Sequence, residues 1–184
     1  EQRVPTLQQV LEIARGRAKV NIELKYYGHE EALEQRVVEA VEAADMADDV
    51  VVMSLKHSGI QALKALRPDW TTGLLTARAL GDLRKVDVDF LAVNAGMATR
   101  RFTRGAQAAG KQVYVWTLNE PADISRLVSR GIDGVITDHP ALARQILEHR
   151  ASRGSVERLL MDLALMIGAS PEPVDEQREL QGAY

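Results

Sequence analysis

The feature that most constrains the fold is a series of short apolar runs, mostly β-branched, most of which are continuously apolar. Such runs are typical of β-strands. A strand with one wet face alternates apolar and polar residues, whereas a strand covered on both faces in a parallel sheet is apolar throughout. The runs therefore predict an α/β fold with a parallel sheet, with strands expected at residues 20–24, 50–54, 72–75, 90–93, 113–117 and 134–137.

Parallel neighbours need crossover helices, and helical patterns lie between the runs. Thr6 and Gln9 form a Thr-x-x-Gln capping box before an apolar helix face that ends at Gly16. Further apolar stripes predict a helix over residues 30–45 and shorter ones around residues 60–66, 102–109 and 124–128. One helix followed by six βα units is typical of a doubly wound sheet or a β/α barrel. No Gly-x-Gly-x-x-Gly follows any run, so a dinucleotide site has no support.

Composition narrows the functional classes. The 184 residues carry 23 basic and 26 acidic side chains, a formal net charge of −3, which argues against nucleic acid as a partner. The absence of cysteine excludes disulfides and thiolate metal sites. No apolar run reaches the roughly 18 residues of a membrane span. The compartment stays open between the cytoplasm and a membrane-associated location.

Three parts are expected along the chain. Residues 1–150 hold the βα units. Residues 151–168 contain an amphipathic helix, predicted over about 155–167 with Ser155 as its cap. Its apolar stripe either packs against the barrel or a second subunit, or lies on a membrane surface. Residues 169–184, with two prolines and several charges, are expected to be disordered.

Candidate site residues are polar groups at the carboxyl ends of the predicted strands, where β/α folds carry their chemistry. Glu23 and Lys25 close the first run two residues apart, so they share one face of the strand. A carboxylate at the mouth of a barrel can bind a hard divalent cation, and a neighbouring lysine can contact a phosphate oxygen. The alternative is an internal ion pair that only fills the mouth.

Four further strand-end residues are weaker candidates. Trp116 offers a flat apolar wall for a small polyol, or is ordinary core packing. Asn119 lies in the turn that follows this strand. Ser54 and Asp138 hold equivalent strand-end positions, where a cap or loop hydrogen bond is the usual role.

The four histidines do not form a recognisable catalytic or metal-binding pattern. There is no His-x-x-x-His or His-Glu-x-x-His, and no Ser-His-Asp arrangement can be inferred. His57 follows a strand closely enough to reach a barrel mouth, but a position at the start of a helix is the simpler interpretation. His29 and His149 are predicted on helix surfaces, and no role is assigned to His139.

Several motifs together carry a resemblance. They are Val4-Pro5-Thr6-Leu7 with Val10-Leu11, Asn21-Ile22-Glu23-Leu24-Lys25, Ser54-Leu55 with His57, Leu74-Leu75, residues 110–119 (GKQVYVWTLN), and residues 131–138 (GIDGVITD) with Pro140. In order and spacing, over about residues 3–147, the chain resembles the glycerophosphodiester phosphodiesterase family. The resemblance implies a TIM-type (β/α)₈ barrel that is incomplete here, with strands 3 to 8 present and residues 20–24 as the third strand.

The resemblance also implies roles for individual residues. Glu23 is expected as a carboxylate ligand of a divalent cation, Mg²⁺ or Ca²⁺, and Lys25 as a phosphate contact. Trp116 is expected to line the glycerol end of the site, with Ser54 and Asn119 in supporting positions. The implied reaction is metal-assisted hydrolysis of a glycerophosphodiester to an alcohol and glycerol phosphate, which makes the intact protein a phosphoric diester hydrolase.

Departures from the family pattern limit this expectation. Leu55 stands where the family usually has Phe, and Lys56 where it often has an acid. The family's His-Arg-Gly element, its acidic pair and its His-Asp are expected before Glu1. The 184-residue chain alone is therefore predicted to be inactive, to lack the catalytic histidines, and to self-associate through the open edges of its barrel. Membrane proximity of the intact protein remains possible.

Two rival functions remain. A barrel without its first strands could serve as a non-catalytic binding or scaffold module. A different phosphate-handling barrel, such as a sugar-phosphate isomerase or synthase, is less well supported, because the last two strand ends lack Gly-rich phosphate loops.

Overall fold

The computed structural model describes residues 3–28, 32–78 and 81–152. Its helices are α1 (Leu7–Ala14), α2 (Leu33–Ala43), α3 (His57–Leu66), α4 (Arg100–Ala108), α5 (Pro121–Val128) and α6 (Pro140–Ser152), with 3₁₀ helices η1 (Ala47–Asp49) and η2 (Leu83–Lys85). Its strands are β1 (Val20–Leu24), β2 (Val50–Ser54), β3 (Thr72–Thr76), β4 (Phe90–Asn94), β5 (Gln112–Trp116) and β6 (Gly134–Val135).

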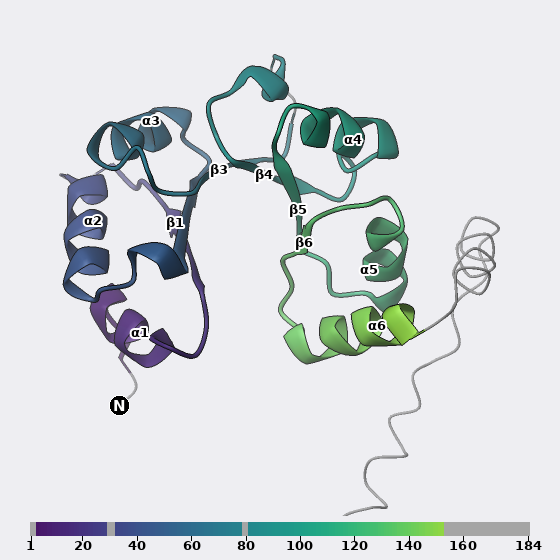
Figure 1. Ribbon diagram of the computed structural model, residues 1–184, viewed down its shortest axis with the longest axis horizontal. Coiled ribbons are helices and arrows are strands. Elements are labelled where there is room, and N and C mark those ends of the chain that lie inside the picture. The colour runs from purple at the N-terminus through teal and green to yellow at the C-terminus, as the bar shows by residue number, and fades with distance from the viewer. Residues whose placement is uncertain (1–2, 29–31, 79–80, 153–184) are drawn as a thin grey trace, which may run out of the picture.

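The strands form one parallel sheet in the order β1-β2-β3-β4-β5-β6. Figure 1 shows the sheet curled into an arch, with the helices along its outer side. The parallel sheet and its curl confirm the prediction of an incomplete β/α barrel. Within the described ranges, β1 and β6 each have only one neighbouring strand. The amphipathic helix predicted at 155–167 and the tail at 169–184 lie outside the described residues.

Local sequence explains where the elements begin. Thr6 caps α1 as predicted: its hydroxyl accepts from the Gln9 N–H, and the Gln9 side chain accepts from the Thr6 N–H. β6 is assigned only two residues of the predicted run, yet its pairing continues. The Ile136 N–H donates to Val115 O, and Leu118 N–H donates to Ile136 O, each at 2.9 Å.

One predicted unit is wrong. The regular βα order requires a helix between β3 and β4, but the described part of that connection holds only η2. Asp82 caps this short turn by accepting from the Arg84 N–H, and Leu83 is buried beneath it. The chain then bends at Val86 and Asp87, with the Val88 N–H donating to Val86 O at 3.0 Å, and Val88 is buried.

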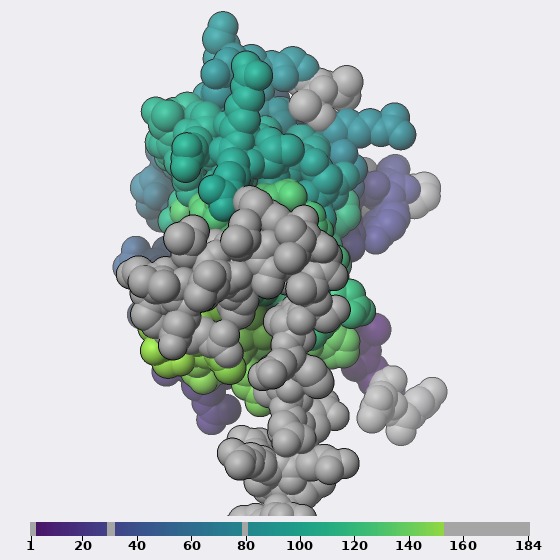
Figure 2. All heavy atoms as spheres, turned by 90° about the vertical axis from the view of Figure 1, so that its right-hand side faces the viewer, coloured from purple at the N-terminus to yellow at the C-terminus, as the bar shows by residue number. Residues whose placement is uncertain are grey.

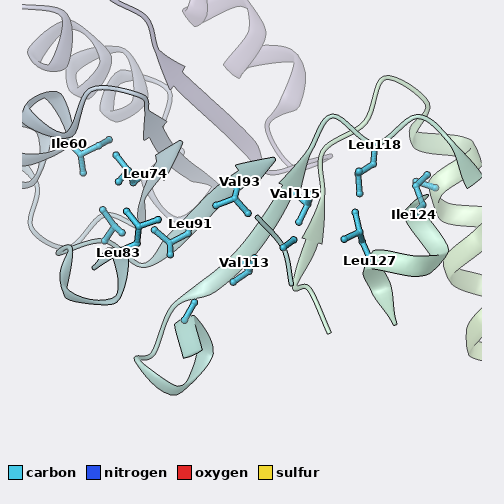
Figure 3. Close-up of a cluster of buried hydrophobic side chains, with 14 of the residues drawn as sticks. Ile60, Leu74, Leu83, Leu91, Val93, Val113, Val115, Leu118, Ile124 and Leu127 are labelled. Carbon is cyan, nitrogen blue, oxygen red and sulfur yellow. The ribbon is translucent and has the colours of Figure 1, made fainter. Parts of the chain in front are cut away.

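The outer face of the sheet and the helices enclose most of the core. One cluster packs helices α3, α4, α5 and α6 against strands β3, β4 and β5. Figure 3 shows Leu74 and Leu91 of these strands beside Ile60 and Leu83, and Val93 and Val115 on the side of Leu118, Ile124 and Leu127. A second cluster joins α1 and α2 to β1 and β2 around Leu11, Val41 and Val52, all fully buried. Burial of this apolar surface is the main force that holds the helices on the sheet.

A smaller cluster lies on the inner face of the sheet. Phe90 is fully buried and stacks on Tyr114 with 4.7 Å between ring centroids. A Cβ atom on Gly73 would overlap the Phe90 ring, and one on Gly134 would lie 2.7 Å from Tyr114 Cδ1. Two aromatic rings are therefore fitted between two glycines across β3 to β6. Burial raises the pKa of the Tyr114 phenol, and the nearby Asp133 carboxylate adds to this.

None of the described helices has the length and apolar character that crossing a bilayer requires.

Candidate functional site

The carboxyl end of β1 carries two charged side chains on the inner face of the sheet. Ile22 and Leu24 are buried against the helices. The alternation of the strand therefore turns Glu23 and Lys25 to the opposite side. Lys25 Nζ lies 3.4 Å from Glu23 Oε2, and the side chains are 57% and 24% exposed, respectively. The two residues form an open ion pair that a ligand can reach.

The carboxyl end of β1 supplies one carboxylate, which is fewer ligands than a metal site needs. Hard divalent cations need several converging oxygen ligands. Across residues 3–28, 32–78 and 81–152, no three His, Asp or Glu side chains form a group that could hold a metal ion. Glu23 contributes one carboxylate, and that carboxylate also contacts Lys25.

Tyr26 supports the end of β1, and the sequence analysis did not select it. Its hydroxyl donates to Glu34 Oε1 at 2.6 Å, and Lys56 Nζ lies 4.6 Å from the centre of its ring. Gly59 leaves room for the ring, because a Cβ atom there would overlap the Tyr26 hydroxyl. These contacts hold Tyr26, the residue that directly follows Lys25, in place. Its partners lie too far along the chain for a local pattern to reveal them.

The carboxyl ends of the parallel strands together form one rim of the sheet. Ser54, at the end of β2, lies on the side of the sheet that faces the helices. It is fully buried, its hydroxyl donates to Leu24 O at 2.9 Å, and its oxygen accepts from the Lys56 N–H at 3.0 Å. These bonds join the ends of β1 and β2. Any support that Ser54 gives to a substrate is therefore indirect, through the position of the β1 end.

Asn119 and Asn94 form hydrogen bonds that join other strand ends and loops of the rim. The Asn119 amide donates to Asp138 Oδ2 at 2.8 Å and its oxygen accepts from Thr137 Oγ1 and the Asp138 N–H, which joins the loops after β5 and β6. Asn94 donates to Ala77 O at 2.9 Å and joins the ends of β3 and β4. Asn94 was missed, although a polar residue directly after the apolar run 90–93 could have indicated it.

Trp116 closes β5 on the inner face. It is half-buried and packs against the inner-face cluster. Its indole Nε1–H donates to Ala92 O at 3.1 Å, which fixes the ring against β4. The structure thus gives a rigid, partly exposed aromatic wall at the same end of the sheet as Lys25. Its contact with a glycerol group stays a prediction.

The described histidines lie apart from the Glu23–Lys25 ion pair. His57 is the first residue of α3, and its Nε2 is buried without a hydrogen-bond partner. It lines a hollow of about 540 Å³ on the outer side, between α3 and the η2 connection. None of the predicted site residues lines that hollow. His139 and His149 are exposed, and His29 lies outside the described residues.

Comparison with known proteins gives the family. The model of the glycerophosphoryl diester phosphodiesterase family matches residues 1–142. The chain belongs to this family. A glycerophosphodiester phosphodiesterase of Caldanaerobacter subterraneus subsp. tengcongensis is 26% identical over 149 residues, which cover 76% of this chain and 60% of the relative. One of Bacillus altitudinis is 28% identical over 159 residues, covering 79% of this chain and 63% of the relative.

Solved phosphodiesterase structures share the fold. A glycerophosphodiester phosphodiesterase of Parabacteroides distasonis aligns with a TM-score of 0.73 at 21% identity, covering 80% of this chain and 66% of the other. An Oleispira antarctica phosphodiesterase in complex with the product sn-glycerol-3-phosphate aligns with a TM-score of 0.72 at 24% identity, covering 78% and 61%. This chain spans about three-fifths of the length of the curated relatives named above.

Proposed function

We propose that this chain forms the substrate-holding part of a metal-dependent phosphodiesterase that hydrolyses glycerophosphodiesters to an alcohol and glycerol phosphate. The observation that carries the proposal is the accessible Glu23–Lys25 pair on the inner face of a family barrel. Parallel strands end at one rim, where β/α barrels carry their chemistry. A neighbour bound to sn-glycerol-3-phosphate supports the substrate class.

Each residue of the rim has a proposed task. Lys25, the more exposed of the pair, neutralises a phosphate oxygen. Glu23 is one ligand of Mg²⁺ or Ca²⁺, and a cation bound there would act as a Lewis acid on the phosphate. The Trp116 ring packs against the glycerol carbons. Ser54 and Asn119 hold the strand ends in place through the bonds described above, so the charged groups meet the substrate in one fixed arrangement.

We further propose that the 184-residue chain has no hydrolase activity by itself. A (β/α)₈ barrel closes with eight strands, whereas the described residues supply six. They also supply no group of three metal-binding side chains. The other ligands and the groups that transfer protons would have to belong to strands that complete the barrel.

The test is release of glycerol phosphate from glycerophosphocholine, with Mg²⁺ or Ca²⁺, by this chain and by the longest gene product that contains it. We expect activity only in the longer protein. There, Lys25→Ala should lower kcat/KM by about two orders of magnitude or more, because a charge contact to the reacting phosphate is lost. Lys19→Ala, an exposed lysine just before β1, is the matched control and should have little effect.

A folded longer protein that hydrolyses no glycerophosphodiester with either cation would contradict the proposal. That result would favour the binding or scaffold module. Equal activity of the Lys25 and Lys19 variants would show instead that the ion pair has only a structural role.

A further inference from the structure

The helix α4 carries a charge pattern that its own stability does not explain. It contains three arginines, Arg100, Arg101 and Arg104, and no acidic residue, in a chain whose net charge is −3. The helix α2, by contrast, holds three glutamates and one arginine. The helix α4 thus carries an excess of positive charge that α2 does not.

The placement of these arginines is unfavourable within the helix. Two of them lie in the first turn, where the helix dipole disfavours cations. Arg100 and Arg104 are spaced i,i+4, so their like charges repel each other on one face. All three are exposed, and no carboxylate among the described residues forms an ion pair with them. The face thus lacks the counter-charge that an ordinary solvated helix surface supplies.

The neighbouring helix α5 and the residues just after it extend the same surface. Arg130 Nη1 donates to Ala98 O at 3.1 Å, directly before α4. Burial lowers the pKa of the Arg130 guanidinium, and the positive charges of Arg126 and Arg100 lower it further. Arg126 pairs with Asp123, so that charge is partly compensated. Figure 2 looks onto this side of the molecule, with α4 in teal in its upper part.

The surface lies beside the rim that carries the proposed site. The helix α4 begins at Arg100, six residues after Asn94 closes β4, and parallel strands end at one side of the sheet. Arg100 and Arg101 therefore occupy the end of α4 nearest the rim. A flat anionic surface that bound them would face the mouth of the barrel.

We propose that Arg100, Arg101, Arg104 and Arg130 form a docking surface for a membrane that contains anionic phospholipids. Juxtaposed arginines bind such membranes additively through the negative surface potential. Nucleic acid fits less well, because single-strand sites add exposed aromatic rings for stacking, and the aromatic residue of α4, Phe102, is half-buried.

If the proposed function holds, membrane docking would also bring the site close to the source of its substrate. A glycerophosphodiester is a glycerophospholipid from which both acyl chains have been removed by hydrolysis of the two ester bonds. A reaction of that class must supply the substrate, and it takes place at a membrane. Docking beside the rim would place the site where the substrate is released. This link rests on the proposed function, whereas the charge argument does not.

The experiment is co-sedimentation of the full 184-residue chain with vesicles of phosphatidylcholine alone and of phosphatidylcholine mixed with phosphatidylserine. We expect binding to the mixed vesicles only, falling as salt rises. The triple variant Arg100→Gln, Arg101→Gln, Arg104→Gln should bind roughly a hundredfold more weakly, since each arginine contributes about a factor of five. The lysine variants at the same positions should retain binding, because the attraction is of charge and not of a shaped contact.

The matched control removes three exposed charges elsewhere: Arg15→Gln, Arg17→Gln and Lys19→Gln. It has the same net charge as the α4 variant and should bind nearly as well as the unchanged chain. Equal losses in the two variants would overturn the proposal, as would tighter binding of an RNA oligonucleotide than of vesicles, or full competition by inorganic phosphate. The sedimentation readout needs no catalysis, so it fails or succeeds independently of the hydrolase assay.

Discussion

The inner face of the sheet is built in two different ways. From β3 to β6 it is closed: Phe90 and Tyr114 stack between Gly73 and Gly134, and a methyl group added to either glycine would press on a ring. At β1 it is open: Glu23 and Lys25 touch only as a partly exposed ion pair. The closed region leaves no room for a larger side chain at either glycine unless a ring moves. The open region leaves two charged groups partly exposed.

The largest expected effect is on association, because the two edges of the described sheet belong to these two regions. Strands β1 and β6 each leave a row of backbone groups without a neighbouring strand. Such edges pair with other chains, and each buried unpaired group costs about 1–3 kcal/mol. We expect the 184-residue chain to form dimers or larger species in light scattering after size exclusion, with a melting temperature that rises with concentration. A monodisperse 20.3 kDa monomer with concentration-independent unfolding would contradict this.

The next effect tests the closed region. Gly73→Val should lower the free energy of unfolding by about 3 kcal/mol, because Phe90 is held by Tyr114 and cannot move aside. Gly105→Ala in α4 is the control: its Cβ would lie 3.7 Å from Arg84 Cδ, an ordinary contact. That change should stabilise the helix by about 0.5–1 kcal/mol. Urea unfolding measures both, and equal effects would mean that the inner face is loosely packed.

Between the two regions lie the hydrogen bonds of the rim. Ser54→Ala removes the donor to Leu24 O and the acceptor of the Lys56 N–H, both at a fully buried site. We expect a loss of about 2 kcal/mol in the free energy of unfolding. Ser58→Ala, at an exposed serine of α3, is the control and should change it by less than about 0.5 kcal/mol. A neutral Ser54→Ala would show that β1 and β2 do not need this link.

The sequence could predict features that depend on local patterns, but not those that depend on contacts between distant residues. The run 50–54 coincides with β2, because a strand covered on both faces must be apolar throughout. The run 20–24 coincides with β1, whose apolar residues alternate with polar ones that face the open side. The β3–β4 connection was predicted as a helix by extending the regular order, and no local pattern supports it. The role of Ser54 depends on an acceptor 30 residues away, and that of Gly73 on a ring of the next strand. Such contacts follow from the curl of the sheet and are invisible to local periodicity.

The smallest expected effect on stability tests the open region. It decides whether the Glu23–Lys25 pair is available to a ligand or is an internal ion pair that only fills the barrel mouth. Partly exposed ion pairs contribute about 0–1 kcal/mol, because water already solvates both charges. A double-mutant cycle with Glu23→Gln and Lys25→Met in the 184-residue chain should therefore give a coupling below about 1 kcal/mol. A coupling above about 2 kcal/mol would mean that the pair is buried in solution and fills the mouth, since only a desolvated pair has that strength. Because neither substitution should unfold the chain, a large loss of hydrolysis by the same variants in the longer protein would then report on the chemistry of the rim and not on its stability.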